Sequence, residues 1–543
     1  MLKNSPLFNP RLYWGSSHRA ALGALALLAL FCLGHLAQRN MADNELNYLA
    51  VARQYVNPAW IPKDWYLNQP IGHQALFSII FGRLAEAWGF LATSIIGRFL
   101  GYSLIASALV CLGRRLGLVL PLILLAVSMF LVRQHAIAGE WMIGGIEEKV
   151  FAYGLILWAI ERMFNKSYRS MAFLLGLATS FHVLVGGYAA LTVLGWIILR
   201  WKRRLPDTRD IILSISFYLA GSLFAIEPIL RQVASQPVPT SSLQPSYIYV
   251  FLRNPHHLNP FRWLSWSWLY WLYLCLLVTT LLISFGVLWR SRPAEGLSEA
   301  HKSRSGLFEF TLISLIPFVL GLAIAPFDRQ GHLLKFYLFR FGDVMLPLNT
   351  YLLTACAVQH LLIEKPYLTD RAKKRLLLTC ILILSVIYLN QAYSFAKDLS
   401  ALRQFPGQHQ GVDPDQKELF DWVKRNTPKN STIVSSPTLP HFSWMSERAT
   451  VAQFKMVPID SAAIIEWYQR LQDLSGNNSP WRDAGFTAVA RLARDYLRLT
   501  TVQVESLMAK YEADYFLTTV EQNLELPIAY RNESYVLYRQ RKS

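Results

Sequence analysis

The chain has 543 residues, of which 53% are hydrophobic and only 16% are charged. This composition excludes an ordinary soluble protein, and apolar runs of ~17–25 residues recur through most of the chain, as in a polytopic helical membrane protein. The formal net charge is +18, but residues 394–543 are close to neutral, so the excess lies in short loops between apolar runs. That is the positive-inside pattern and not a nucleic-acid-binding patch.

Clusters of Lys and Arg separate the apolar runs, and such clusters face the cytoplasm in membrane proteins. Placing them there predicts eleven membrane-spanning helices, near residues 20–37, 90–112, 117–132, 149–164, 170–184, 186–200, 209–226, 263–289, 308–325, 343–362 and 376–393. The first run has no small-x-small cleavage site and is predicted to be a retained anchor. Eleven crossings predict an integral protein of the bacterial inner membrane, with a cytoplasmic N-terminus and a periplasmic C-terminal domain.

Two segments depart from a simple series of spans. The predicted helices 170–184 and 186–200 are short for two full crossings, and Gly186-Gly187 would have to make the turn between them. Residues 75–89 are interpreted as a further re-entrant or interfacial helix.

The first external loop, residues 38–74, carries two carboxylates one residue apart, Asp43 and Glu45. An amphipathic helix suited to the membrane interface continues from them. Such a pair predicts either a general base or two oxygen ligands for a divalent cation, Mg²⁺ or Mn²⁺. The alternative is a solvated loop with two surface acids, because the D-x-E pattern is common.

The second external loop, residues 133–149, carries Glu140, Glu147 and Glu148 beside three glycines. Glu148 is a candidate for a supporting catalytic role or for metal ligation. The alternative is that these acids only complement the dipole at the start of the next helix. His182 lies within an apolar run, where a lone histidine is more often a satisfied core donor.

Five further candidates for ligand binding lie in two later external loops, 227–262 and 326–342: Arg253, His256, His257, Lys335 and Arg340. External loops of membrane proteins normally carry few cations, so the arginines and the lysine predict a phosphate or pyrophosphate partner. The alternative is ordinary loop charge. The adjacent histidines would bind a metal or a phosphate, but no acid at ligand spacing indicates a zinc site.

From about Ser394 the composition is that of a soluble domain. Helices are predicted at 419–425, 462–474, 486–499 and 502–511, and strands at 432–435, 449–454, 515–518 and 535–538. This alternation predicts a small α/β domain. The chain is therefore divided into a multipass membrane domain, residues 1–393, and an extracytoplasmic α/β domain, residues 394–543.

An acidic motif in the first external loop, an interfacial helix behind it, about eleven spans and a C-terminal α/β domain together resemble the GT-C superfamily of polyprenyl-phosphate-dependent membrane glycosyltransferases. The resemblance implies that the first-loop acid is the catalytic carboxylate, which by position matches Asp43, with Glu45 as second choice. An acidic motif in the next external loop would correspond to Glu147 or Glu148.

The segments RNPHHLNP, FRFGDVMLPL and LFDWVKRNTPKNS also resemble a group of uncharacterised bacterial multipass membrane proteins associated with that superfamily. The C-terminal part lacks the W-W-D-type motif of oligosaccharyltransferases, which argues against peptide glycosylation.

We therefore expect a glycosyltransferase that moves a sugar from a polyprenyl-phosphate donor to a glycan, lipid or protein acceptor outside the cell. Membrane lipids are expected partners and nucleic acid is not. The alternative is a non-enzymatic lipid or glycan transporter or a membrane assembly scaffold. Against transport, the sequence shows no inverted repeat and no clearly broken helix pair in matching halves.

Overall fold

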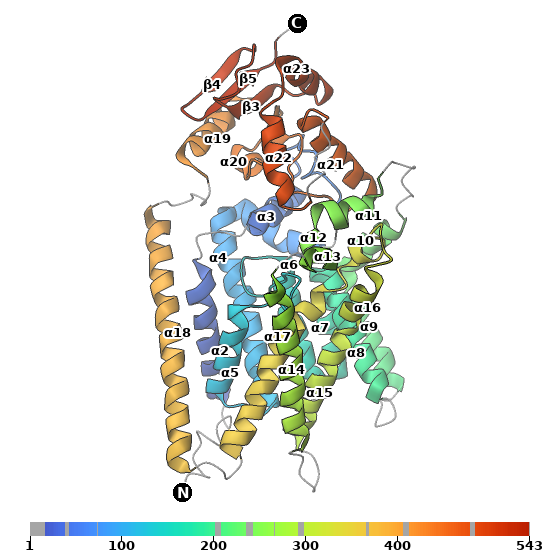
Figure 1. Cartoon of the computed structure of the whole chain (residues 1–543), viewed down its shortest axis with the longest axis vertical. Helices are drawn as coiled ribbons and strands as arrows, with labels where there is room; N and C mark the ends of the chain where they lie inside the picture. The colour runs from blue at the N-terminus through green and yellow to red at the C-terminus, as the bar shows by residue number, and fades with distance from the viewer. Residues whose placement is uncertain are drawn as a thin grey trace.

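The computed structural model describes residues 17–37, 43–72, 74–200, 208–234, 243–264, 267–290, 298–364, 369–404, 412–477 and 484–541. Long helices run side by side in a bundle, and the C-terminal residues form a mixed α/β domain at one end of it (Figure 1). Short helical segments and loops lie between the bundle and this domain.

Within those ranges, seven helices are long and apolar enough to cross a membrane: His18–Leu36, Ala75–Arg115, Val183–Arg200, Trp268–Arg290, Glu299–Ile324, Arg340–Leu362 and Leu378–Leu399. A pair bent by 71°, Arg209–Gly221 and Leu223–Arg231, is an eighth if it counts as one broken span. The chain is therefore a polytopic helical membrane protein, as predicted.

These spans comprise the following elements: α2 (Ser17–Phe31) with η2 (Cys32–Leu36), α4 (Ala75–Arg115), α8 (Val183–Arg200), α9 (Thr208–Gly221), α10 (Leu223–Ala234), α14 (Trp268–Arg290), α15 (Glu299–Ser314), α16 (Ile316–Ile324), α17 (Arg340–Gln359) with η6 (His360–Glu364), and α18 (Asp370–Gln404). Helix α18 continues past the predicted domain boundary at residue 393.

Three of the eleven predicted spans are shorter helices: α5 (Leu120–Val132), α6 (Glu148–Phe164) and α7 (Tyr168–Phe181). They have 13, 17 and 14 residues. At about 1.5 Å per residue, none is as long as the ~30 Å hydrocarbon core. Almost all of α6 is buried inside the bundle. The apolar runs were correctly interpreted as helices, but apolar character reflects burial in protein as well as contact with lipid.

The predicted turn at Gly186-Gly187 is wrong. Helix α7 ends at Phe181, and α8 begins at Val183, directly after the extended residue His182. Gly186 lies inside α8, where a Cβ atom would come within 2.3 Å of the Thr179 backbone nitrogen. The glycine therefore allows the two helices to pack closely, and the break is at the histidine.

The predicted amphipathic helix is α3 (Asp43–Val56), which packs against the first part of α4. Helix α4 is broken at Gly89, whose φ of 76° lies in the left-handed region, so residues 75–88 form a distinct helix as predicted. At Gly82, a Cβ atom would lie 2.1 Å from the carbonyl oxygen of Ala52. The absence of a side chain there sets the close approach of α3 to α4.

Short elements form the layer between the bundle and the C-terminal domain: α11 (Pro245–Tyr247), η4 (Ile248–Arg253), α12 (Pro255–Leu258), α13 (Pro260–Leu264) and η5 (Leu334–Phe336). The loop 133–147 precedes α6; most of its residues are buried and none is exposed.

The C-terminal domain is α/β, as predicted. It contains α19 (Pro414–Asn426), β1 (Thr432–Val434), α20 (Phe442–Ser446), β2 (Ala449–Thr450), α21 (Ser461–Leu474), α22 (Thr487–Tyr496), α23 (Thr501–Lys510), β3 (Tyr515–Thr519), β4 (Ile528–Arg531) and β5 (Tyr535–Arg539). The sheet order is β2-β1-β3-β5-β4, with β1 parallel to β2 and β3, and β5 antiparallel to β3 and β4. Helix α20 and strand β4 were not predicted. Strand β4 has no buried residue and hence no apolar pattern.

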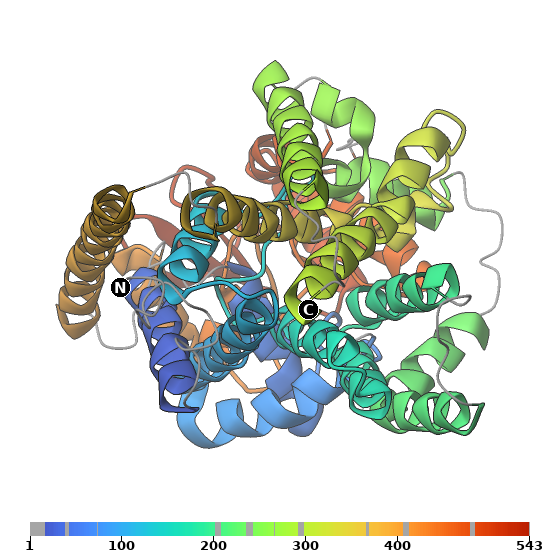
Figure 2. The same cartoon turned by 90° about the horizontal axis from the view of Figure 1, so that it is seen from below.

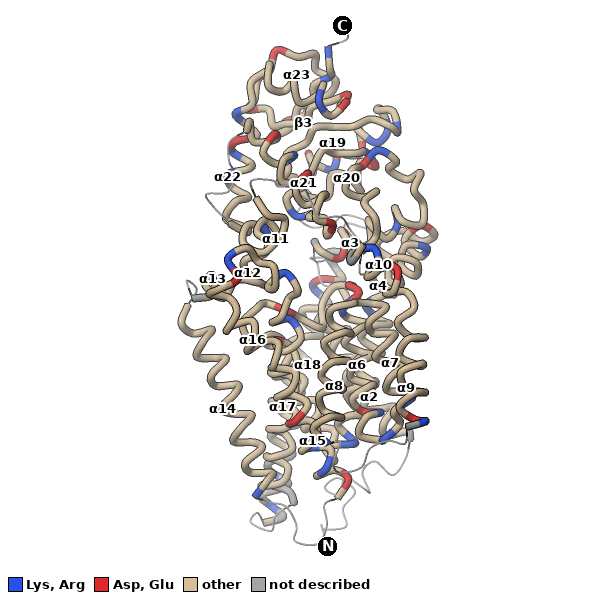
Figure 3. The backbone as a smooth tube through the Cα atoms, turned by 90° about the vertical axis from the view of Figure 1, so that its right-hand side faces the viewer, with Lys and Arg blue, Asp and Glu red and all other residues tan. Residues whose placement is uncertain are grey.

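Helix α18 stands at the edge of the bundle beside α2 (Figure 2), and the Tyr388 hydroxyl donates a hydrogen bond of 2.7 Å to the Ala26 carbonyl. Charged residues gather towards the two ends of the bundle, whereas its middle is mostly free of them (Figure 3). The layer facing the C-terminal domain contains the charges considered next.

Candidate functional site

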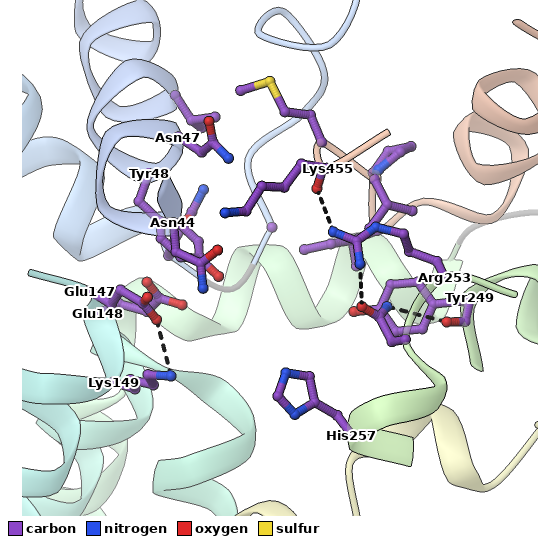
Figure 4. Close-up of a pocket in the computed structure, with 18 of the residues that line it drawn as sticks. Asn44, Asn47, Tyr48, Glu147, Glu148, Lys149, Tyr249, Arg253, His257 and Lys455 are labelled. Atoms are coloured by element: carbon purple, nitrogen blue, oxygen red, sulfur yellow. Dashed lines mark hydrogen bonds and ion pairs between the residues drawn. The ribbon is translucent and has the colours of Figure 1, made fainter. Parts of the chain in front are cut away.

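A cavity of about 500 Å³ lies between the helical bundle and the C-terminal domain. This volume is within the ~300–1,000 Å³ usual for small-molecule sites. The cavity is lined from both sides: α3, the start of α6, η4 and α12 contribute from the membrane domain, and residues 455–460 and Phe486 contribute from the C-terminal domain. Figure 4 shows 18 of its lining residues.

Five of the eight predicted site residues line this one cavity: Glu148, Arg253, His256, His257 and Arg340. They come from three external loops that are far apart in the sequence. Asp43 is the first residue of α3, and its side chain lies outside what the structure describes; the next residue, Asn44, lines the cavity. Glu45 and Lys335 do not line it.

The contacts of Glu45 favour a structural role over the predicted catalytic or metal-binding one. Its carboxylate is fully buried and pairs with the guanidinium of Arg98 on α4, whose Nε donates a hydrogen bond of 3.1 Å. The Ser94 hydroxyl and, at 3.0 Å, the Ile146 amide also donate to Glu45. Both oxygens are thus used to join α3, α4 and the loop 133–147, so Glu45 is a structural residue.

The same contacts bear on the predicted divalent cation. A cation held by Asp43 and Glu45 together would have to displace the Arg98 guanidinium from a site without solvent access. Across the described ranges, no group of three or more His, Cys, Asp and Glu side chains could hold a metal ion. The residues present do not fit a Mg²⁺ or Mn²⁺ site at that pair.

Lys335 lies on η5 and is half-buried, with its ammonium 5.3 Å from the ring centre of Phe336. It does not line the cavity, so the cavity gives no support to its prediction as a ligand for the phosphate. The neighbouring Tyr337 does line the cavity, in a left-handed backbone conformation with φ of 54°.

An aspartate outside the predicted site residues organises the loop that carries the acids. The buried carboxylate of Asp343 on α17 accepts hydrogen bonds from three backbone amides of the loop 133–147. The donors are Ile137 at 2.7 Å, Ala138 at 2.9 Å and Glu140 at 3.0 Å. This carboxylate holds the extended backbone in place, which explains how a buried loop satisfies its amides.

Glu140 is the centre of an ion-pair network. Its carboxylate lies 2.6 Å from Nζ of Lys149 and 2.7 Å from Nε of Arg340. Burial opposes ionisation of Glu140, but the two cations outweigh it and lower its pKa to about 2. Glu140 is therefore an ionised anchor that positions both cations at the cavity.

Glu147 lies in a different electrostatic environment. Burial is the largest influence and, with Glu148 and Glu140 nearby, raises the pKa of Glu147 to about 7 despite the opposing effect of Lys149. One oxygen lies 3.2 Å from Nζ of Lys149 (Figure 4). The other oxygen, Oε1, is buried and has no hydrogen-bond partner among the described residues. Glu147 can thus gain or lose a proton near neutral pH.

Glu148 and His182 meet on the same side of the cavity. Nε2 of His182 lies 3.9 Å from Glu148 Oε1 and 2.9 Å from Nη1 of Arg340. His182 is therefore not an isolated core histidine, because it connects a carboxylate and a guanidinium at the cavity wall.

Arg253 joins the membrane domain to the C-terminal domain. Its guanidinium, on a side chain only 6% exposed, donates to the carbonyls of Phe454 at 2.9 Å and Lys455 at 3.0 Å, and to the Asn254 side chain at 3.3 Å. All three acceptors are neutral, and no described carboxylate forms an ion pair with Arg253. A buried cation that has no countercharge among the described residues and faces a cavity is suited to an anionic ligand.

The two histidines are neutral hydrogen-bonding groups. Burial lowers the pKa of His257 to about 4 and that of His256 to about 2, so neither ring is charged near neutral pH. Nδ1 of His257 lies 2.7 Å from the Ala138 carbonyl, so a neutral ring donates there and Nε2 is left as an acceptor. The His256 ring packs against Phe486 of the C-terminal domain.

Some lining residues were not predicted, because their residue types carry no charge or motif signal in the sequence or because they belong to the other domain. Asn44, Asn47 and Tyr48 form the α3 wall, and Lys455 extends into the cavity from the C-terminal domain (Figure 4). For the α3 residues, their spacing of three and four positions behind an acidic motif was the one available signal.

Comparisons with known proteins give a family match for part of the chain. Residues 414–474, from α19 to α21, match the "Domain of unknown function (DUF6798)" family. No curated protein matches the chain. A solved structure that aligns with it is the crystal structure of ArnT from Cupriavidus metallidurans in the apo state, with 9% sequence identity, coverage of 95% of this chain and 96% of that chain, and a TM-score of 0.36. The function proposed below therefore rests on the geometry of the cavity.

Proposed function

We propose that this protein is a GT-C-like glycosyltransferase that moves a sugar from a polyprenyl-phosphate donor to a hydroxyl-bearing acceptor on the extracytoplasmic face of the membrane. The observation that carries the proposal is the convergence of buried carboxylates and cations from separate loops in one cavity. This cavity lies between the membrane-spanning helices and the C-terminal domain. A lipid-linked phosphate reaches such a position from the bilayer, and a polar acceptor reaches it from outside.

The carboxylates would serve the acceptor. In an inverting transfer, a general base removes the proton of the acceptor hydroxyl as its oxygen attacks the anomeric carbon, and the bond to the lipid phosphate breaks. The resemblance assigns the base to Asp43. Among the carboxylates with described side chains, Glu147 has the suitable properties: burial, one oxygen without a partner and a pKa near neutral.

The cations would serve the donor. Negative charge develops on the phosphate as the glycosidic bond breaks, and fixed cations in a water-poor site stabilise it. Arg253 is the best candidate because its charge has no carboxylate partner among the described residues. Arg340 and Lys149 share the Glu140 carboxylate, so part of their positive charge is already compensated and each would contribute a weaker field than an unpaired cation.

Transfer of a labelled sugar tests this proposal. The full-length protein in nanodiscs would be given a panel of polyprenyl-phosphosugars labelled in the sugar, together with bacterial envelope lipids and glycans as acceptors. We expect label to move to the acceptor fraction with the wild type, and to fall about 10²–10⁴-fold in Glu147→Gln or Asp43→Asn. The matched control is Tyr55→Ala, on an exposed position of α3 outside the cavity.

Full transfer by both carboxylate variants would overturn the assignment of the base. Binding of the lipid without transfer by the wild type, across the whole panel, would instead favour a lipid or glycan transporter.

A further inference from the structure

The wall of the cavity formed by α3 differs chemically from the rest. Asn44, Asn47 and Tyr48 face the cavity from one side of this helix, because positions three and four apart share a face. All three side chains are neutral, and each can both donate and accept hydrogen bonds. They lie on the same side as Glu147 and Glu148 (Figure 4).

The hydrogen-bonding capacity of this wall is not used within the described part of the protein. There, the amides of Asn44 and Asn47 and the hydroxyl of Tyr48 bond to no other residue. The contrast with Gln54 on the same helix is clear, because its amide donates to the Pro58 carbonyl at 2.9 Å and accepts from the Ile61 amide at 3.0 Å. Gln54 thus uses its hydrogen bonds within the fold, whereas Asn44, Asn47 and Tyr48 can offer theirs to a ligand.

The cavity is also polarised from one side to the other. Arg253 lies across it from the α3 wall, with the two glutamates on the α3 side (Figure 4). A ligand that fits this arrangement has an anionic group near Arg253 and hydrogen-bonding groups, such as hydroxyls, near α3. A phosphosugar has that form.

We propose that Asn44, Asn47 and Tyr48 bind the hydroxyl groups of the sugar on the lipid-linked donor. The inference rests on the proposed function and deepens it by naming the residues that hold the sugar. Hydroxyl groups match the mixed donors and acceptors of the amides and the phenol.

Comparing two lipids on the full-length protein in nanodiscs tests the inference. The probes are a polyprenyl phosphate and the same lipid carrying glucose, and the readout is the Kd of each. The wild type should bind both lipids, because both carry the phosphate. Asn47→Ala should weaken binding of the glucosylated lipid about tenfold, the loss expected for one or two hydrogen bonds, and leave binding of the bare phosphate within about twofold.

Three variants make this comparison specific. Asn47→Asp keeps the shape of the side chain but loses the amide donors, so it should resemble Asn47→Ala. Arg253→Gln should weaken binding of both lipids. Tyr55→Ala, on the same helix but outside the cavity, should change neither Kd. An unchanged thermal midpoint for each variant shows that the fold is intact.

The possible failures are distinguishable. If Asn47→Ala and Asn47→Asp weaken binding of both lipids equally, or change neither Kd, the sugar does not bind at α3 and the inference is overturned. If the wild type binds only the bare phosphate, the sugar site at α3 is overturned while binding of a lipid phosphate stands. If the wild type binds neither lipid, the proposed function is overturned as well.

Discussion

Two pairs of Glu and Arg connect α3 to α4, and burial gives them different energetic weight. Glu45 and Arg98 are 0% and 2% exposed, whereas Arg53 and Glu86 are 20% and 39% exposed, with Arg53 Nε lying 2.6 Å from Glu86 Oε2. Removing one partner of a buried pair leaves an uncompensated charge, but an exposed pair is screened by water.

Glu45→Gln should therefore lower the free energy of unfolding by about 3–5 kcal/mol. The matched control Glu86→Gln should lower it by less than about 1 kcal/mol. Thermal unfolding of the purified variants in detergent measures both. Equal effects of the two variants would contradict the structural role of Glu45.

The carboxylate of Glu147 makes activity and stability respond to pH in opposite directions. Its pKa is raised to about 7 by burial, with the nearby acids Glu148 and Glu140 acting in the same direction. If Glu147 is the base, sugar transfer should rise with pH through about 7, because the base must be ionised. The pH profile of transfer by the wild type measures this, and a flat profile between pH 5 and 8 would contradict the role.

The stability contribution of Glu147 has the other sign. In the unfolded chain its pKa is about 4.3, so between about pH 4 and 7 the folded state binds more protons than the unfolded state. The stabilisation is complete below that window and is lost as pH rises through it. In Glu147→Gln, the midpoint of thermal unfolding should fall less between pH 4.5 and 7 than in the wild type.

For individual residues, the sequence predicts which charged side chains belong to a site better than it predicts what each of them does. Arg253, His256, His257, Arg340 and Glu148 were placed at a site because charged groups at the membrane edge are costly. Glu45 and Lys335 were selected by the same argument but lie elsewhere. The pairing of Glu45 with Arg98 depends on a contact between residues 53 positions apart, which no local pattern contains.

At the scale of elements, α3 is the helix that connects the fold to the cavity. Its buried face includes Leu46, Leu49 and Ala50, and a neighbouring face presents Asn44 and Asn47 to the cavity. The position of that second face depends on how closely α3 packs on α4, and Gly82 permits a close approach of the two helices.

Gly82→Ala should therefore destabilise the protein by about 1–3 kcal/mol and weaken donor binding, because a Cβ atom would push α3 away from α4. The control is Gly286→Ala on α14, where nothing lies within 4 Å of the added Cβ and helix propensity improves. Thermal unfolding and lipid binding measure the two effects. A neutral Gly82→Ala would contradict the close packing.

Most elements could be predicted from the sequence because apolar periodicity and turn residues are local. The lengths and boundaries of some elements were predicted less well. Helix α6 has the apolar sequence of a membrane span, but it is a short helix buried in the protein. Strand β4 was missed because it has no buried residue. The buried loop 133–147 could not be predicted as ordered structure, since its backbone amides are satisfied by Asp343, about 200 residues later.

At the scale of the whole molecule, the C-terminal domain completes the cavity and does not merely sit beside it. The Gly485 amide donates to the Leu252 carbonyl at 2.6 Å, and Asp64 of the first loop accepts from the Ser443 hydroxyl at 3.0 Å. Together with the hydrogen bonds of Arg253, these contacts join two external loops of the membrane domain to the C-terminal domain.

The proposed orientation places this domain outside the cell. Glu533, exposed between β4 and β5, and Lys302, exposed at the other end of the bundle on α15, lie on opposite sides of the predicted membrane. In intact spheroplasts, a membrane-impermeant maleimide should label Glu533→Cys and not Lys302→Cys, above the background of the five native cysteines. Labelling of Lys302→Cys alone would reverse the orientation.

The most direct test of the proposed function is a cryo-EM structure of the full-length protein in nanodiscs with a saturating polyprenyl phosphate. We expect density for the phosphate in the cavity within hydrogen-bond distance of Arg253, with the lipid chain leaving towards the bilayer. A structure in which the lipid binds only outside the cavity, while Arg253 keeps the same neutral partners, would contradict the proposed function.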